Sequence, residues 1–293
     1  MSRFVQLGRV AAAVGLVAAG VAVGASAAVA GTPKAKYNAA DAAMVPAAYK
    51  GVTLQVATDA TYAPDEFVQG SNIVGFDVDL VNAIATTLGI KVHTNNVTFD
   101  NIIPGLQAKR YAIGNSSFTD TKAREKLVNF VTYFQAGEGV YAKSSSTLKF
   151  KGLTSFCGHS VAVERGTVEE TDAKAVKCSG GSKVSVLSFA TQTEANTAVS
   201  SGRADFGFLD SQIAGYVAST SHGVFKLVGK AINVAPYGMA TQKNPDGRNL
   251  AMAMQMAIKT LIANGTYGAI LSKWGVESGA LSANQIVLNG AIS

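Results

Sequence analysis

Three polar turns of the sequence carry side chains that could hold a small charged ligand. Each turn follows a predicted strand and precedes a predicted helix, which is where ligands bind in open α/β sheets. The first turn, 58–64, offers a carboxylate on Asp59 and an aromatic ring on Tyr62. Asp59 could pair with a cationic group while Tyr62 covers a side chain. An Asx turn with a packed tyrosine is the alternative explanation of the same residues.

The second turn, 115–124, joins hydroxyl side chains to a helix start and an arginine. Ser116, Ser117 and Thr119 place hydroxyls and free backbone N–H groups where anions bind at a helix N-terminus. Arg124 falls in the first turn of that helix, where a cation opposes the helix dipole. The position makes sense if the guanidinium binds a carboxylate, because each charged hydrogen bond contributes about 1.5–3 kcal/mol. A solvated surface arginine is the alternative.

The third site combines the start of one helix with the end of a later strand. Thr167 opens a T-x-x-E capping box that ends at Glu170 and includes Val168. Asp210 ends an apolar strand, so its carboxylate could receive an ammonium group or cap the helix that starts at Ser211. A plain N-cap is the alternative role of Thr167. The three turns together complement a zwitterionic amino acid. The arginine could bind its carboxylate, the aspartate its ammonium group, and the tyrosine could cover its side chain.

Strands and helices alternate along the chain and must position these turns. Apolar residues at helical spacing from Phe76 to Leu88, ended by Gly89, predict the clearest helix. The alternation favours an α/β fold with largely parallel sheets. Two such runs, separated near 137–146, indicate two lobes of similar build. Strands are predicted at 52–56, 92–97, 111–116, 160–164 and 205–209, and helices start near Asp100, Thr121, Thr167, Thr191 and Pro245.

The N-terminus has the order of a secretory signal. Arg3 and Arg9 precede a weakly apolar run over 10–23, and small residues then allow cleavage after Ala27 or Ala30. An uncleaved membrane anchor is the alternative. The region contains no cysteine and therefore no lipoprotein attachment site. We expect a protein exported across the inner membrane into the periplasm or cell envelope.

Charge and cysteine content exclude other classes. The net charge of +6 in 293 residues is dispersed, without a block of like charges, so nucleic acid is not expected as a partner. Export places Cys157 and Cys178 in an oxidising compartment, where we expect a disulfide that closes a loop of about 20 residues and contributes roughly 3 kcal/mol. Two free buried thiols are the alternative. Two cysteines and three scattered histidines predict no metal site.

A series of motifs resembles the family-3 bacterial solute-binding proteins, the polar amino-acid-binding proteins of ABC importers. The resemblance spans about residues 52–275, and no single motif would be specific without the others in order. The motifs lie at 58–64 (TDATYAP), 74–80 (VGFDVDL), 99–106 (FDNIIPGL), 119–124 (TDTKAR), 131–134 (VTYF), 165–167 (RGT), 202–205 (GRAD) with Asp210, and 264–267 (NGTY) before Trp274.

This resemblance implies a periplasmic-binding-protein-like fold of type II, with two α/β lobes joined by two hinge strands and a ligand cleft between them. The hinges would lie near 140–143 and 234–238. Arg124, helped by Thr119 and the Thr167–Val168 segment, would bind the ligand α-carboxylate, and Asp210 with Ser117 would bind the ammonium. Ser116, next to Ser117, is also expected among the ligand-binding residues. Asp59 and Tyr62 would face the ligand side chain. The domains expected are a signal peptide (1–30), a linker (31–50), lobe 1 (51–141 and 236–276), lobe 2 (142–235) and a C-terminal tail (277–293).

Two departures from the family pattern concern ligand choice. Asp65 replaces the usual aromatic residue after the first proline, which favours a polar or cationic ligand. Val168 replaces a second threonine and removes a hydroxyl near the carboxylate site. We expect a monomer without cofactor that captures an L-amino acid by hinge closure and delivers it to a membrane permease. A dehydratase of the prephenate type, with Glu138 or Glu164 as its acid or base, and a sensory domain are the alternatives.

Overall fold

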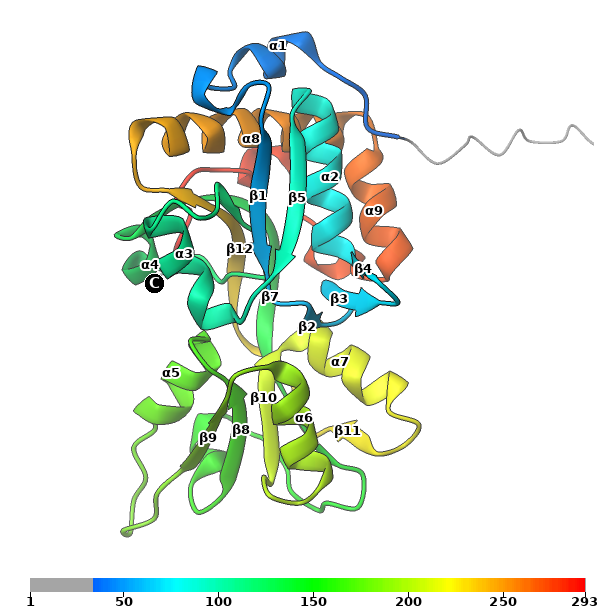
Figure 1. The fold of residues 1–293 in the computed structure, drawn as a ribbon. Coiled ribbons are helices and arrows are strands. Elements are labelled where there is room, and N and C mark those ends of the chain that lie inside the picture. Colours follow the sequence, from blue (N-terminus) through cyan, green and yellow to red (C-terminus); the bar gives the residue numbers. More distant parts are fainter. Residues whose placement is uncertain (1–33, 293) are drawn as a thin grey trace, which may run out of the picture. The chain divides into compact units, whose positions relative to one another are not determined.

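The computed structural model describes residues 34–292 (Figure 1). The expected signal peptide over 1–30 lies outside these described residues. Within them, one mixed sheet runs in the order β5-β1-β6-β12-β7-β10-β8-β9, with β11 paired to β7. The strands of this sheet are β1 (Thr53–Thr58), β5 (Lys91–Asn96), β6 (Ile113–Gly114), β7 (Val128–Lys143), β8 (Ser160–Glu164), β9 (Ser185–Phe189), β10 (Phe206–Asp210), β11 (Phe225–Leu227) and β12 (Ile232–Gln242).

Two parallel groups of strands stand on either side of an antiparallel pair. Strand β1 pairs in parallel with β5 and β6, and β8 pairs in parallel with β9 and β10. Between the groups, β7 and β12 pair antiparallel over most of the length of β12, with a register shift between Tyr237 and Gly238. The short strands β2 (Thr61–Tyr62), β3 (Glu66–Gln69) and β4 (Asn72–Val74) form a separate antiparallel sheet. We call the β5-β1-β6 side lobe 1 and the β10-β8-β9 side lobe 2.

Helices cover both groups of strands (Figure 1). Lobe 1 carries α2, α3, α8 and α9, whereas α5, α6 and α7 pack on lobe 2. Gly89 ends α2 in a left-handed conformation (φ 63°), as predicted from its position. The bounds are α1 Ala39–Ala43, α2 Phe76–Leu88, α3 Ile102–Gln107, α4 Lys122–Glu125, α5 Val168–Ala175, α6 Gln192–Ser200, α7 Ser211–Thr220, α8 Pro245–Ala263 and α9 Thr266–Trp274.

Predicted helix caps hold the polar turns in shape. The side chains of Thr121, Thr167 and Thr191 each accept a hydrogen bond from the backbone N–H three residues later, starting α4, α5 and α6. Asp100 does not cap the next helix as expected. Its carboxylate instead accepts a hydrogen bond from the Thr98 hydroxyl, at the start of a short 3-10 turn.

Each lobe has its own apolar core. In lobe 1, α2 and α8 press Phe76 and Met254 against the aromatic residues of β7. In lobe 2, Phe156, Phe206 and Phe208 stack between the sheet and α5, with ring centroids 5.1–5.4 Å apart for the pairs that Phe156 makes. The two lobes are therefore each packed around their own strand group, and β7 and β12 belong to both.

The chain differs from the sequence expectations at three places. Strand β7 continues without a break through Gly137, where the two runs of strands were expected to separate. Within the expected linker, helix α1 and a 3-10 turn at Ala47–Tyr49 pack on α2 and α8 and bury Asp41, Val45 and Tyr49. Residues of the tail after 277 also pack on the fold, and Ile286 is fully buried.

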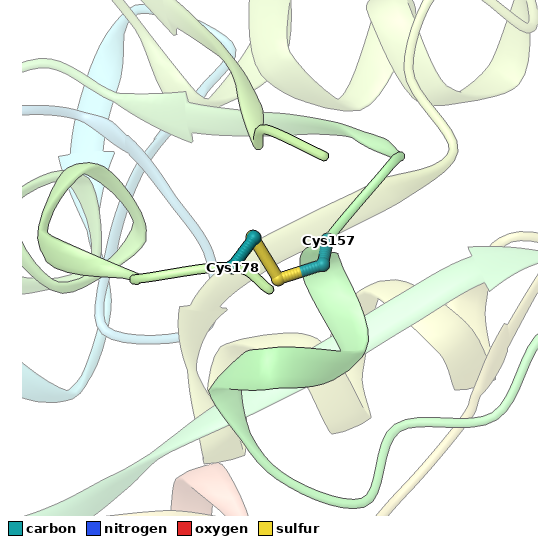
Figure 2. Close-up of a disulfide and its surroundings, with 2 residues drawn as sticks. All are labelled: Cys157 and Cys178. Atoms are coloured by element: carbon teal, nitrogen blue, oxygen red, sulfur yellow. A yellow bond between two sulfur atoms is a disulfide. The ribbon is translucent and has the colours of Figure 1, made fainter. Parts of the chain in front are cut away.

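A disulfide joins Cys157 and Cys178, with the two Cα atoms 5.7 Å apart (Figure 2). Cys157 follows the 3-10 turn Leu153–Phe156, and Cys178 follows α5. The predicted pairing is confirmed. Among residues 34–292, none of the helices combines the length and the apolar character that crossing a membrane requires.

Candidate functional site

A small cavity lies at the junction of the two lobes. Every residue predicted to bind the ligand lines it, with the exception of Asp59. The predicted lining residues are Tyr62, Ser116, Ser117, Thr119, Arg124, Thr167, Val168 and Asp210. Four further residues line the cavity, namely Glu66, Phe99, Glu164 and Glu169. The turns that follow β1, β6, β8 and β10 supply most of this lining, as expected for the carboxyl ends of strands.

Arg124 is the cation of the cavity. Its Nη1 donates to the carbonyl of Thr119 at 2.8 Å, and its Nη2 donates to the carbonyl of Gly166 at 2.8 Å. The guanidinium carbon lies 5.3 and 5.4 Å from the ring centroids of Phe99 and Phe118. Burial lowers the pKa of Arg124 to about 10, so the group stays charged at neutral pH. Hydrogen bonds to both lobes and contacts with two aromatic rings thus orient the guanidinium of this arginine.

Tyr62 and Asp210 connect the lobes directly. The Tyr62 hydroxyl donates to Asp210 Oδ2 at 2.8 Å and accepts from the Asp210 backbone N–H at 3.0 Å. Both side chains are buried, and burial together with the charge of Glu169 raises the pKa of Asp210 well above its usual range. Burial favours the neutral form of such a carboxyl, and a cation placed beside it favours the ionised form.

The serines of the second turn position a carboxyl that the sequence analysis did not single out. Ser116 Oγ donates to Glu66 Oε1 at 2.9 Å and accepts from the Asp59 backbone N–H at 2.9 Å. Ser117, which has a positive φ of 48°, donates from its hydroxyl to Asp65 Oδ2 at 2.9 Å. Asp65 itself is fully buried and does not line the cavity, whereas the next residue, Glu66, does.

Asp59 acts on the cavity through its neighbours rather than from its wall. Its Oδ1 accepts hydrogen bonds from the Thr61 backbone and hydroxyl at 3.1 and 2.6 Å. Its Oδ2 accepts from the Phe99 backbone N–H at 3.0 Å. Both oxygens are therefore used within the protein, which corresponds to the Asx-type alternative considered from the sequence. Asp59 holds Phe99 in place at the edge of the cavity.

Two buried carboxyls provide free acceptors. Glu164 Oε1 and Glu169 Oε1 are both buried, and neither has a hydrogen-bond partner among residues 34–292. Burial raises the pKa of Glu169 to about 8, with the negative charge of Glu138 as the next cause. Burial and the neighbouring Asp59 raise the pKa of Glu164 well above its usual range. Each of these oxygens can accept a hydrogen bond from a donor group placed in the cavity.

Signals for some of the additional residues were present in the sequence. Glu164 ends a predicted strand in the same way as Asp210 ends β10, and Glu169 lies in the first turn of the helix capped by Thr167. Glu66 and Phe99 had no comparable signal, because their contribution depends on how the β2–β3 hairpin and the turn after β5 fold over the cavity. Over the part of the chain that the structure describes, no group of three or more His, Cys, Asp and Glu side chains is arranged to hold a metal ion.

Residues 54–277 match the family described as bacterial extracellular solute-binding proteins, family 3. This chain belongs to that family. The arginine-binding protein ArgT of Corynebacterium glutamicum is 34% identical over 247 residues, which cover 82% of this chain and 80% of ArgT. The family resemblance drawn from the motifs is confirmed, and the family's extracellular setting agrees with the expected export.

Solved structures give the same fold. A structure of an ancestral arginine-binding protein bound to arginine is 34% identical, with a TM-score of 0.70, and covers 76% of this chain and 97% of the other. The ancestral amino acid-binding protein AncCDT-1, a precursor of cyclohexadienyl dehydratase, is also 34% identical, with a TM-score of 0.67 and coverage of 76% and 95%. The fold is that of the type II periplasmic binding proteins, with two α/β lobes and two hinge strands.

Proposed function

We propose that this protein captures a cationic L-amino acid, with arginine as the first candidate, and delivers it to the permease of an ABC importer. The observation that carries the proposal is the charge of the cavity. A single guanidinium, Arg124, faces four carboxyls on Glu66, Glu164, Glu169 and Asp210. A ligand with one carboxylate and two cationic groups would balance this set better than a neutral zwitterion. The arginine-binding relatives support the choice.

In this proposal, the α-carboxylate and the α-ammonium of the ligand bind to oppositely charged residues of the cavity. Arg124 binds the α-carboxylate through charge-assisted hydrogen bonds, with Thr119, Thr167 and the backbone N–H of Val168 beside it. Asp210 receives the α-ammonium. Ser116 and Ser117, already bonded to the carboxyl group of Glu66 or Asp65, complete the ammonium side.

The side chain of the ligand would then meet the remaining carboxyls. Glu164 and Glu169 offer their unpaired oxygens, and Glu66 offers a carboxyl held by Ser116. The rings of Tyr62 and Phe99 would cover the aliphatic stem. Asp59 supports this wall from behind, a role that replaces the direct contact expected from the sequence.

Capture would occur by closure of the lobes about β7 and β12. Four contacts support a closed state, because each joins lobe 1 or its hairpin to lobe 2. Two of them are the Tyr62–Asp210 bond and the Arg124–Gly166 bond described above. The others are an ion pair of Arg165 with Asp100 at 3.5 Å and a hydrogen bond from Gln212 Nε2 to Asp65 Oδ2 at 3.0 Å. We retain the expected lobe bounds of 51–141 with 236–276 and 142–235 as part of this proposal, together with a monomeric state and a place in the periplasm or cell envelope.

A binding experiment on ligand-free protein tests the proposal. The mature chain is unfolded, dialysed and refolded to remove bound ligand, and then melted with and without each common L-amino acid. A ligand present at a hundred times its dissociation constant stabilises the fold by about 2.7 kcal/mol, which shifts the melting temperature by several degrees. We expect the largest shift with arginine, and none with arginine in Arg124→Ala or Asp210→Ala.

Arg203→Ala is the matched control for loss of an arginine, because Arg203 is exposed and stacks on Phe189 at 5.7 Å outside the cavity. It should bind as tightly as the unchanged protein. A shift with neutral amino acids alone would contradict the cationic ligand. No shift with any amino acid would refute the capture of amino acids altogether.

A dehydratase is the second candidate, favoured by two observations. The cavity holds carboxyls whose pKa burial raises, as a general acid requires, with Glu169 at about 8. The fold also resembles that of a precursor of cyclohexadienyl dehydratase. Turnover of prephenate by the purified protein would support this activity. Absence of turnover at high protein concentration would refute the dehydratase activity.

A further inference from the structure

The C-terminal segment 286–291 runs along lobe 1 and ends beside helix α4, which carries Arg124 (Figure 1). We call it the strap. Leu288 forms a β-bridge with Val131 of β7, and Asn289 Oδ1 accepts from the Phe130 backbone N–H at 2.8 Å. The family match covers residues 54–277, and the strap follows it in the sequence.

The end of the strap makes hydrogen bonds to residues before and after Arg124 in the sequence. The backbone N–H of Gly290 donates to Asp120 Oδ2 at 2.7 Å, and that of Ala291 donates to Glu125 Oε1 at 3.0 Å. Asp120 precedes the N-cap of α4, and Glu125 follows Arg124 directly. The four-residue helix that carries the guanidinium is thereby tied to the strap at each end.

The strap also influences the charge of Asp120, a carboxyl that acts on the Arg124 guanidinium. Burial raises the pKa of Asp120 to about 7, with the charge of Glu125 as the next cause, whereas the N–H of Gly290 favours the ionised form. The ionised Asp120 in turn favours the charged form of Arg124. The space at the strap is tight, since a Cβ on Gly290 would lie 2.7 Å from Thr132 Cγ2 and 2.8 Å from Val287 Cγ2.

From these contacts we propose that the strap positions Arg124 and so sets the affinity for the ligand carboxylate. Gly290 and Ala291 are positioning residues, since they act through Asp120 and Glu125 and do not line the cavity. The inference rests on the proposed function, in which Arg124 binds the α-carboxylate. It assigns a role in ligand recognition to a segment outside the family match.

The test removes one amide of the strap. Ala291→Pro eliminates the N–H that donates to Glu125 without shortening the chain. Ala283→Pro is the matched control, because Ala283 begins the 3-10 turn Ala283–Gln285 after an extended Ser282, and its N–H makes no hydrogen bond within the described residues. Both proteins are titrated with L-arginine and with agmatine, which has the same guanidinium but no carboxylate. We expect arginine to bind about tenfold more weakly to Ala291→Pro, and agmatine affinity to change by less than about twofold.

Each outcome of this titration decides the proposal. A selective loss for arginine supports the strap, and equal losses for both probes or an unchanged arginine affinity would overturn it. If Ala291→Pro does not fold, Gly290→Ala perturbs the neighbouring bond from the Gly290 N–H to Asp120 through the tight approach to Thr132, and it is titrated in the same way.

If the unchanged protein binds neither probe, the proposed function fails, and a ligand-free measurement still decides the role of the strap. The Nε–Hε resonance of Arg124, assigned with Arg124→Lys, should shift in Ala291→Pro but not in Ala283→Pro. An unmoved resonance would overturn the positioning role.

Discussion

The bond between Tyr62 and Asp210 makes a quantitative prediction for lobe closure. Tyr62→Phe removes a hydroxyl that donates to a carboxylate at 2.8 Å and accepts from a backbone N–H at 3.0 Å across the two lobes. A hydrogen bond to a charged group contributes about 1.5–3 kcal/mol and a neutral one about 0.5–1.5 kcal/mol. Losing both should destabilise the closed form by about 2–4.5 kcal/mol, which weakens arginine binding by about 30- to 2,000-fold.

The assay is isothermal titration calorimetry together with thermal melting of the ligand-free protein. The melting temperature without ligand should change little, because the open form leaves the Tyr62 hydroxyl in water. Tyr141→Phe is the matched control, since its hydroxyl donates to Asn196 of α6 at 2.5 Å and Tyr141 does not line the cavity. That variant should melt at lower temperature and bind normally. A change in arginine affinity of less than about threefold in Tyr62→Phe would refute the closure role of this bond.

Three further predictions follow from contacts of the site and the core. Replacing Cys157 and Cys178 by serine should lower the free energy of unfolding by about 3 kcal/mol, measured by urea denaturation, and leave arginine affinity unchanged. Arginine affinity should rise from pH 5 to about 8, because the Glu169 carboxyl must lose its proton to pair with the ligand, and Glu169→Gln should flatten this profile in calorimetry. Asp59→Asn should cost about 1–3 kcal/mol of stability in thermal melting, since one acceptor is lost behind Phe99, while arginine stays preferred over glutamine.

The sign of the pH effect on stability is opposite to that on binding. Burial raises the pKa of Glu169 above its value in the unfolded chain, so the folded ligand-free protein binds more protons between the two pKa values. Stability therefore falls as the pH rises from about 4.5 to about 8. Melting of the ligand-free protein across this range checks the prediction, and a less steep fall in Glu169→Gln would assign the effect to this carboxyl.

Local rules predicted much of the fold from the sequence. Caps at Thr121, Thr167 and Thr191, and the glycine after α2, depend on neighbouring residues only, so the spacing was sufficient to find them. The turns that line the cavity follow the strand ends, so the sequence could group the residues from Tyr62 to Asp210 that the structure places around one cavity. Asp210 and Arg124 lie 86 positions apart in the sequence and line the same cavity, because the strands of both lobes end at the junction of the lobes.

Features that depend on distant packing escaped the sequence rules. Buried carboxyls such as Glu66 and Glu169 contradict the usual exposure of acidic residues, and only the folded cavity explains them. The continuity of β7 through Gly137 depends on its pairing with β12, about a hundred residues later in the chain. Helix α1 and the strap have few periodic apolar residues, and their order comes from docking onto lobe 1.

The arrangement of strands in the sheet also determines the order in which the chain can fold as it emerges N-terminus first during synthesis. Strands β8, β9 and β10 pair with one another and with β7, so their part of the sheet can form once residue 210 has emerged. Strand β6 pairs with β12, and the core beside β1 needs α8, which ends at residue 263. The half that begins first in the sequence is therefore completed last, and its apolar surface stays uncovered for most of synthesis.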